Sequence, residues 1–165
     1  MEKTLLIFFL SFISCGSSNL KNTKSDFDNR IILTYSYVAE KYDSNIVVSN
    51  SFANIDIVNF AEEISKNKNK KMSIVLDSLI KVKEESSYIK KKYPIKTLLN
   101  KTNNKGNLKL FFSKPKDNYI MVEVFKTDED TSYERLTMFG SSDIYLLYFK
   151  NEEIIDKYQI KLDYN

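Results

Sequence analysis

Cys15 is the first residue of this 165-residue chain whose type and position point to distinctive chemistry. It is the only cysteine, so a disulfide within the chain is impossible. It follows directly after Thr4 to Ser14, an uninterrupted stretch of apolar and small residues. A lone structural cysteine falls more often inside a core strand or helix than directly behind such a leader. The position therefore indicates a thiol that is covalently modified.

The residues before Cys15 have the organisation of a secretory signal. Met1-Glu2-Lys3 is a short, weakly basic start, and the apolar stretch is too short to span a bilayer. Phe12-Ile13-Ser14-Cys15 resembles the lipobox of bacterial lipoproteins. The resemblance implies that residues 1–14 are a signal peptide and that Cys15 carries acyl chains such as palmitate. An ordinary signal peptide cut near Ser17 and an unprocessed apolar anchor are the alternatives.

Histidine is absent from the whole chain. This excludes Ser-His-Asp and Cys-His nucleophilic sites and zinc sites with histidine ligands. Acylation of Cys15 would remove thiolate ligation of a metal as well. An enzyme would have to use carboxylates, lysine, tyrosine or serine alone, which favours a protein that is not an enzyme. We predict no catalytic, cofactor-binding or metal-binding residues.

Three groups of polar residues have a composition that could form a site. Asp128-Glu129-Asp130 could offer oxygens to a cation such as calcium, but no glycine follows to make the tight turn, so we predict a solvated hairpin loop. Gly140-Ser141-Ser142, with Asp143, lacks the pattern of a nucleophile elbow or a phosphate loop and is predicted to bend a strand. Glu62-Glu63 and Glu84-Glu85 are adjacent pairs, whose members point to different sides.

Charge is segregated along the chain although the net charge is only +3. From Lys66 to Lys116 there are 15 lysines and 3 acidic residues, and from Asp117 to Asn165 there are 11 acidic and 5 basic residues. The basic segment could meet an anionic partner, face the acidic segment in the fold, or solvate the surface, and the last interpretation is favoured. Nucleic acid is not expected as a partner of an exported protein.

Composition bounds the organisation of the chain. Lysine, asparagine, isoleucine, tyrosine and phenylalanine are abundant, which is similar to the AT-rich composition of many Bacteroidetes. Residues 15–25 are small and polar and are predicted to be a flexible tether. Residues 26–165 are enough for a single domain. Gly16, in place of the aspartate that retains enterobacterial lipoproteins in the inner membrane, favours the outer membrane, facing the periplasm.

The first half of the mature chain has helical periodicity. A helix within 26–42 is predicted by the spacing of Ile31, Tyr35, Val38 and Tyr42. The alternation of Leu33, Tyr35 and Tyr37 is also compatible with a strand. Residues 46–48 predict a short strand. Ile57, Phe60, Ala61 and Ile64 form a stripe in a predicted helix from Asn54, its cap, to Lys66. Residues 72–92 fit a helix or a strand, and the helix is favoured; Pro94 stops it, and 95–99 could form a further short element.

The C-terminal third is predicted to be strands joined by short turns, at residues 107–113, 119–126, 133–139, 143–150 and 154–164. In the last strand Ile154, Tyr158, Ile160, Leu162 and Tyr164 are expected on one face. The predicted fold class is therefore α+β, with N-terminal helices packed on one face of a C-terminal antiparallel meander of four to five strands. A curved sheet that wraps helices, as in cystatin-like or nuclear-transport-factor-like folds, satisfies this order; the resemblance is one of fold alone.

Two classes of function follow from these observations. The first is a lipid-anchored cell-envelope protein that acts as a non-enzymatic binding or interaction module for a protein partner. The alternative is a cone-shaped domain that binds, or weakly acts on, a small molecule in a pocket lined by aromatic residues. A deep pocket with a buried acid would favour the alternative. A filled interface between sheet and helices, with a flat basic patch, would favour the interaction module.

Overall fold

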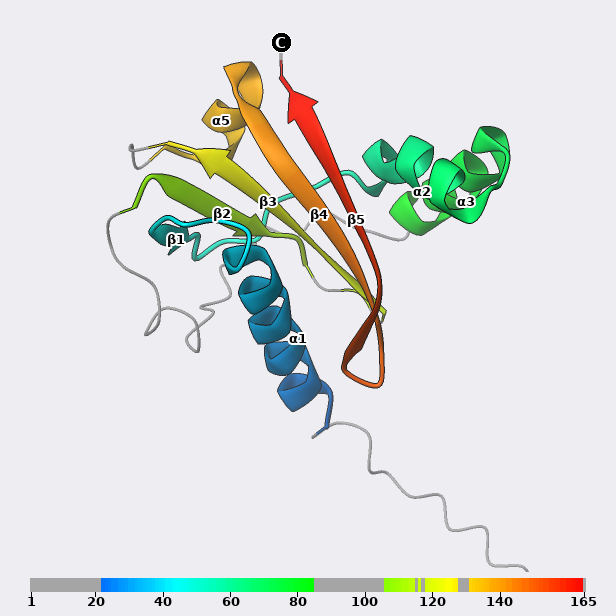
Figure 1. Ribbon diagram of the computed structural model, residues 1–165, viewed down its shortest axis with the longest axis horizontal. Coiled ribbons are helices and arrows are strands. Elements are labelled where there is room, and N and C mark those ends of the chain that lie inside the picture. The colour runs from blue at the N-terminus through cyan, green and yellow to red at the C-terminus, as the bar shows by residue number, and fades with distance from the viewer. Residues whose placement is uncertain (1–21, 85–105, 115, 117, 128–130, 165) are drawn as a thin grey trace, which may run out of the picture.

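The computed structural model describes residues 22–84, 106–114, 116, 118–127 and 131–164, with the backbone alone at 22–28 and 84. Helices and a five-stranded sheet are combined, and most helices precede most strands, so the α+β prediction is confirmed (Figure 1). Cys15, residues 16–21 of the predicted tether, the acidic cluster 128–130, Glu85, Pro94 and residues 95–99 lie outside the described residues, whereas residues 22–25 of the predicted tether are helical.

The helical elements come mainly from the first half of the chain. They are α1 (Asn22–Ala39), the 3-10 turn η1 (Ile57–Phe60), α2 (Ala61–Lys68), α3 (Met72–Glu84) and α5 (Tyr133–Phe139). The strands are β1 (Ile46–Val48), β2 (Leu108–Phe112), β3 (Tyr119–Lys126), β4 (Ser141–Lys150) and β5 (Glu153–Asp163). In the part of the chain that the structure describes, no helix is both long and apolar enough to cross a membrane.

The five strands lie in the sheet in chain order, β1-β2-β3-β4-β5. The last four form an antiparallel meander, as predicted, and β1 is added parallel to β2, with Ile46 opposite Leu108. Because the chain must cross over before it adds a parallel strand, η1, α2 and α3 fall between β1 and β2. The short β1 and the long β5 are the two edges of the sheet.

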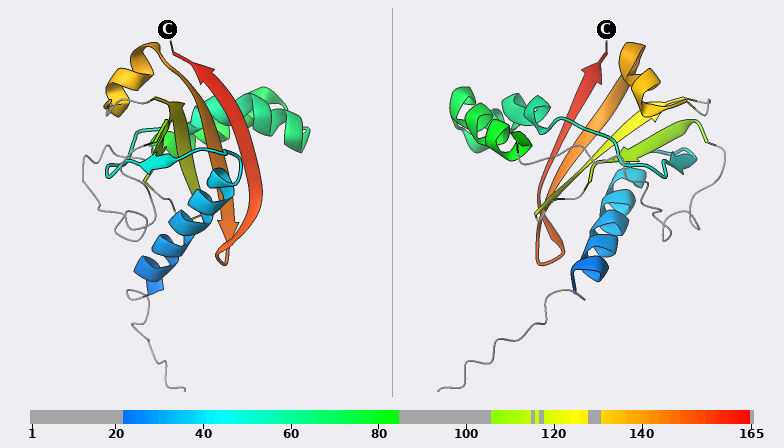
Figure 2. Two further views of the ribbon diagram at one scale, coloured as in Figure 1. Left: turned by 60° about the vertical axis from the view of Figure 1, so that its left-hand side comes forward. Right: turned by 180° about the vertical axis from the view of Figure 1, so that it is seen from behind.

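Helices cover both faces of the sheet, whereas one covered face was expected (Figures 1 and 2). On one face, Ile31 and Val38 of α1 pack against side chains such as Leu110 and Val122. On the other face, Phe60 of η1 and residues of α2 and α3 pack against side chains such as Leu146. Seven of the eight residues of β3 are buried because this strand is central and both of its faces are covered.

Residues 133–139, predicted as a strand, form α5 instead. The Ser132 hydroxyl accepts a hydrogen bond from the backbone N–H of Arg135, and Glu134 lies in the first turn, where the helix dipole favours an acid. The helix ends at Gly140, and Ser141 and Ser142 already belong to β4, so they do not form the predicted bend. Alternation of apolar and polar residues in a stretch this short did not separate strand from helix.

Two smaller expectations are also corrected. Asp56, rather than Asn54, caps the turn that leads into α2, and its carboxylate accepts from the N–H of Val58 at 3.0 Å. A bulge in β5 places Asp156 opposite Tyr148 and Ile154 opposite Phe149. The extra residue shifts the side-chain alternation, so Ile154 packs on the α1 face while Tyr158, Ile160 and Leu162 pack on the other.

Candidate functional site

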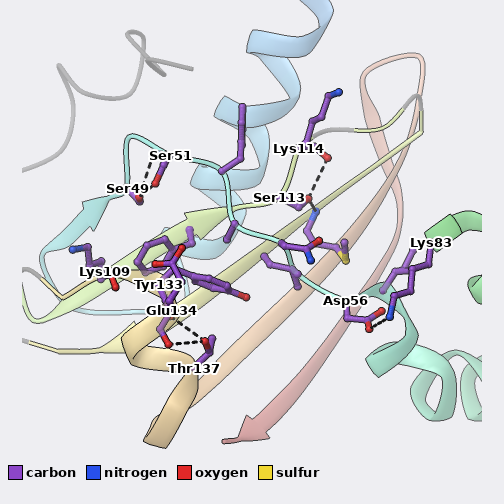
Figure 3. A pocket seen from close by; sticks show the side chains of 18 of the residues that line it. Ser49, Ser51, Asp56, Lys83, Lys109, Ser113, Lys114, Tyr133, Glu134 and Thr137 are labelled. Atoms are coloured by element: carbon purple, nitrogen blue, oxygen red, sulfur yellow. Dashed lines mark hydrogen bonds and ion pairs between the residues drawn. The ribbon is translucent and has the colours of Figure 1, made fainter. Parts of the chain in front are cut away.

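An open cleft of about 1390 Å³ lies on the sheet face opposite α1 (Figure 3). Its floor is formed by β2 and β3 side chains, including Phe111 and Met121. One wall is the extended segment 49–58 with the α3 residues Ile80 and Lys83, and the other wall is α5 with the residues just before it. Three segments far apart in the chain therefore meet around the cleft.

The walls are positioned by bonds to the sheet. The N–H groups of Ser49 and Ala53 donate to the carbonyl oxygens of Leu110 and Phe112, both at 2.8 Å, so segment 49–53 runs alongside β2 beyond the end of β1. On the far wall, Tyr133 packs its ring against Phe111 and Phe125, with centroid distances of 5.1 and 6.1 Å. These contacts hold α5 over the sheet.

Beneath Tyr133 lies Glu123, a carboxylate with 0% exposure in the middle of β3. The Tyr133 hydroxyl donates a hydrogen bond to one carboxylate oxygen at 2.6 Å. The hydroxyls of Ser142 and Tyr164 donate hydrogen bonds to the other oxygen at 2.5 and 2.6 Å. Hydroxyl donors to a charged acceptor form short, strong bonds, and both oxygens are satisfied. The three donors come from α5, β4 and the chain end, so Glu123 ties these elements together.

The same cluster perturbs its tyrosines. Burial, and then the charge of Glu123, raises the pKa of Tyr133 above the usual range of a phenol. Burial, and then the hydrogen bond to Glu123, raises the pKa of Tyr164 in the same direction. Both phenols are therefore held protonated and act as donors to the carboxylate. Glu123 does not line the cleft, because Tyr133 stands between them.

Charged side chains around the cleft are mostly basic. Four lysines, Lys83, Lys109, Lys114 and Lys116, line it together with two acids, Asp56 and Glu134. Lys109 is buried on the floor and donates to the Thr131 carbonyl oxygen at 2.9 Å. Lys83 and Asp56 form an ion pair at 2.5 Å on the α3 side, visible in Figure 3. The lining is thus net positive and also rich in serine and threonine hydroxyls.

The polar side chains of residues Gly140 to Asp143 do not come together to form a site. Ser142 is buried and bonds Glu123 on one face of the sheet, whereas Asp143, its neighbour in β4, points to the opposite face. There Asp143 accepts from the Tyr42 hydroxyl at 2.9 Å, and Tyr42 also bonds Tyr145. This second polar cluster joins the end of α1 to β4, and burial raises the pKa of Tyr42.

The predicted pairs of adjacent acids do not form a catalytic pair. Glu62 is exposed on α2 and forms an i, i+4 ion pair with Lys66 at 2.6 Å, and Glu63 lies beside it in the first turn. Of the second pair, Glu84 ends α3 and Glu85 lies outside the described residues. Within the residues that the structure does describe, no group of three or more Asp, Glu or Cys side chains is arranged to hold a metal ion.

Sequence reasoning did not single out Glu123, Lys109 or Tyr133. Glu123 carried a usable signal, since it is the only charged residue inside the apolar run Tyr119–Phe125. A charge in a strand that is buried on both faces needs dedicated partners. Those partners, in contrast, are 10 to 41 residues away in the chain, and only the fold brings them together. Searches against protein-family models, curated proteins and solved structures found no match to this chain.

Proposed function

We propose that this chain is a lipid-anchored, non-enzymatic binding module of a bacterial cell envelope, and that it binds a segment of a partner protein in the cleft. The observation that carries the proposal is the cleft itself, open and lined by both apolar and basic side chains. Its volume of about 1390 Å³ exceeds the roughly 300–1,000 Å³ of most small-molecule sites. A stretch of polypeptide fills such a space better than a metabolite does.

The lining predicts the character of that polypeptide. Four lysines against two acids favour a segment that carries acidic side chains. Met138 is 57% exposed at the end of α5 and lines the cleft, and Phe139, next to it, is 87% exposed. Exposed large apolar side chains at the rim of a cleft are suited to anchor a protein partner. We therefore expect a segment with acidic groups and at least one apolar side chain.

The buried acid supports binding rather than catalysis. Glu123 is shielded from the cleft by Tyr133, and both of its oxygens are occupied by hydroxyl donors. A general base has to reach the proton that it removes. In this arrangement Glu123 fixes the α5 wall instead. The chain also has no histidine that could serve as a base in its place.

The anchor and the cleft are compatible in space. Cys15 precedes the start of α1 at Asn22 by seven residues. The N-terminal end of α1 and the helix α5 lie at opposite ends of the molecule in Figures 1 and 2. A lipid on Cys15 would therefore be linked to the end of the molecule that lies far from α5, which carries Met138 and Phe139. We place the protein in the outer membrane, facing the periplasm.

The anchor is tested by mass spectrometry of the full chain extracted from bacterial membranes. We expect the wild-type chain to begin at an acylated Cys15 and the Cys15→Ala variant to keep its leader and carry no lipid. A wild-type chain that keeps residues 1–14, or that lacks acyl chains, would refute the anchor. Such a result would not bear on the binding cleft, which has its own test.

The cleft is tested by affinity purification of the tagged full chain from native membranes. We expect a stoichiometric protein to accompany the wild type and to be reduced about tenfold with Lys114→Glu/Lys116→Glu, since two charges at the site change sign. Lys126→Glu/Lys150→Glu is the matched control, with the same change of charge outside the cleft. Equal capture by the two double variants, or a chain that arrives alone with a bound small molecule, would contradict a protein-binding cleft.

A further inference from the structure

The outer edge of β5 presents a row of backbone groups ready for pairing. β5 is an edge strand of 11 residues, bonded to β4 on one side only. The N–H of Tyr164 donates to the Gly140 carbonyl oxygen at 2.8 Å, so the even-numbered residues from 156 to 164, after the bulge, point their backbone groups at β4. The odd-numbered residues 157, 159, 161 and 163 point theirs outward. No described residue hydrogen-bonds these four outward amides.

An exposed edge of this kind can pair with a strand of another chain, and natural proteins usually protect their sheet edges against such pairing. Helices α2 and α3 lie beside β5 and extend past its edge in Figure 1. Their contacts with the strand are made by side chains, such as the bond between Lys68 and Asp156 at 2.8 Å. The outward backbone groups of residues 157, 159, 161 and 163 are therefore left open, and the side chains of these four residues are exposed.

The charges on this edge limit the ways in which β5 can pair with itself. In an antiparallel pair an outward-pointing residue must lie opposite another outward-pointing residue. If two identical copies pair symmetrically, the symmetry axis must therefore pass by the same residue of both strands. Residues that lie equally far before and after this central residue are then opposite each other. Centring on Ile160 places Lys157 opposite Asp163 of the other copy, twice, and Gln159 opposite Lys161, twice.

Most neighbouring centres are unfavourable. Centring on Lys157 or Lys161 places a lysine against itself, and centring on Gln159 places Lys157 opposite Lys161. Centring on Tyr158 pairs no opposite charges, because Lys157 then lies opposite Gln159. Like charges directly opposite each other destabilise a strand pair, and opposite charges stabilise it. Centring on Leu162 also places Lys161 opposite Asp163, twice, but then only residues 161–163 of β5 lie opposite each other, against residues 157–163 in the Ile160 register. The Ile160 register is therefore the one that pairs opposite charges over the longer stretch of the strand.

In the register centred on Ile160, the side chains that meet on the other face of the sheet are apolar. It places Ile160 against Ile160 of the second copy and Tyr158 against Leu162, all side chains of the face that α2 and α3 cover. We propose that two copies of this chain pair through the outer edges of β5, antiparallel and centred on Ile160, to form one continuous sheet of ten strands. This pairing is independent of the cleft, which lies over β2 and β3.

Disulfide trapping in native membranes tests the register with the full chain. At the centre, residue 160 lies in a non-hydrogen-bonded pair, in which the two Cα atoms are about 4.5 Å apart, within the range that a disulfide bridges. We expect Ile160→Cys to form a disulfide-linked dimer on mild oxidation. Ile155→Cys is the control: residue 155 is 55% exposed, more than Ile160, yet about 33 Å from its own copy in this register. The wild type measures any background from Cys15.

Charge reversal provides a second readout that does not depend on how well each variant folds. In the Ile160→Cys background, Lys157→Asp or Asp163→Lys alone places two like-charged pairs in the interface. We expect either change to reduce the cross-linked fraction about tenfold. The combined change restores opposite charges, and we expect it to restore cross-linking. The two residues lie six positions apart on one strand, so recovery cannot come from a contact within one chain.

The results that overturn the proposal are defined in advance. Ile155→Cys cross-linking as strongly as Ile160→Cys would show random collision. A disulfide from Ile160→Cys to a different protein would show that the edge pairs with another partner. Failure of the combined charge variant to recover cross-linking would rule out this register, and absence of any Ile160→Cys dimer would rule out self-pairing.

Discussion

Glu123 is the residue on which the α5 wall of the cleft depends. A buried carboxylate is costly unless it is hydrogen-bonded, and here three hydroxyl groups supply the bonds. Two of the donors, Tyr133 and Ser142, come from different elements that pack on the same strand. The charge of Glu123 is therefore used to fix the relative positions of α5 and β4.

Replacement of Glu123 by glutamine should destabilise the fold. The shape is kept, but the charge is lost and an N–H₂ group then faces a hydroxyl that had been donating. We expect Glu123→Gln to lower the free energy of unfolding by about 2–3 kcal/mol, measured by urea denaturation. Glu153→Gln, at an exposed position, should change it by less than about 0.5 kcal/mol. A Glu123→Gln variant as stable as the control would show that the network contributes nothing.

The tyrosines of this network predict a loss of stability at alkaline pH. A phenol in the unfolded chain ionises at about pH 10, whereas burial and Glu123 raise the pKa of Tyr133 and Tyr164 in the folded state. Above about pH 10 the unfolded state therefore binds fewer protons than the folded state, and the free energy of unfolding falls as pH rises. Below that pH the stabilisation is fully present.

The slope of the free energy of unfolding against pH shows whether Tyr133 is responsible. Each such tyrosine contributes up to about 1.4 kcal/mol per pH unit between its unfolded and folded pKa. We expect Tyr133→Phe to make the fall above about pH 10 shallower by up to this amount, in urea unfolding measured at several pH values. An identical slope in the wild type and the variant would mean that Tyr133 is not held protonated by the fold.

At the scale of elements, α5 is the least securely packed helix of those described, since none of its residues is fully buried. Tyr133 anchors its start, and Gly140 lets the chain turn tightly into β4 at its end. A Cβ atom added at Gly140 would collide with the backbone carbonyl oxygen of Leu136. The helix thus depends on one residue at each end.

Substitution of Gly140 should displace α5. We expect Gly140→Ala to cost about 1–3 kcal/mol, because the colliding atom belongs to the backbone and cannot simply rotate away. Ser141→Ala, at the exposed next position, should stay within about 0.5 kcal/mol of the wild type. Thermal or urea unfolding of both variants measures the difference. Equal stability of the two would show that the end of α5 has room to move.

The elements also show how far periodicity alone reaches. The stripe of Ile31 and Val38 in α1, the stripe of Phe60 and Ala61 at the start of α2, and the apolar run of β3 were readable because packing on one or two faces imposes a period. α5 was not readable as a helix, since it buries too little to show a stripe. The bulge that turns Ile154 to the α1 face adds a single residue, which no alternation pattern announces.

At the scale of the whole molecule, part of the charge segregation is compensated by the fold. Lys68 pairs with Asp156 of the C-terminal acidic segment, and Lys83 pairs with Asp56. Both pairs are partly exposed, so water and salt screen them and they contribute little to stability. Other lysines of the basic segment, Lys109 and Lys114 among them, line the cleft instead. This division between the two roles could not be predicted from the sequence, because it depends on which segments meet.

The cleft also depends on which segments the fold brings together. Its walls and floor come from segments around residues 49–58, 109–121 and 131–138, which the parallel addition of β1 and the turn into α5 bring together. The sequence predicted the class of fold and a choice between an interaction surface and an aromatic pocket. Neither the position of the cleft nor the way Glu123 is enclosed followed from composition or spacing.

Site-specific photo-cross-linking in native membranes tests the binding cleft most directly. A photoreactive residue is placed in the full chain at Met138, on the cleft rim, or at Ile155, which has nearly the same exposure, 55% against 57%, but lies outside the cleft. We predict that Met138 cross-links to one envelope protein and that Ile155 does not, and that Lys114→Glu/Lys116→Glu removes the product. Equal products from both positions, or none from Met138, would contradict the account.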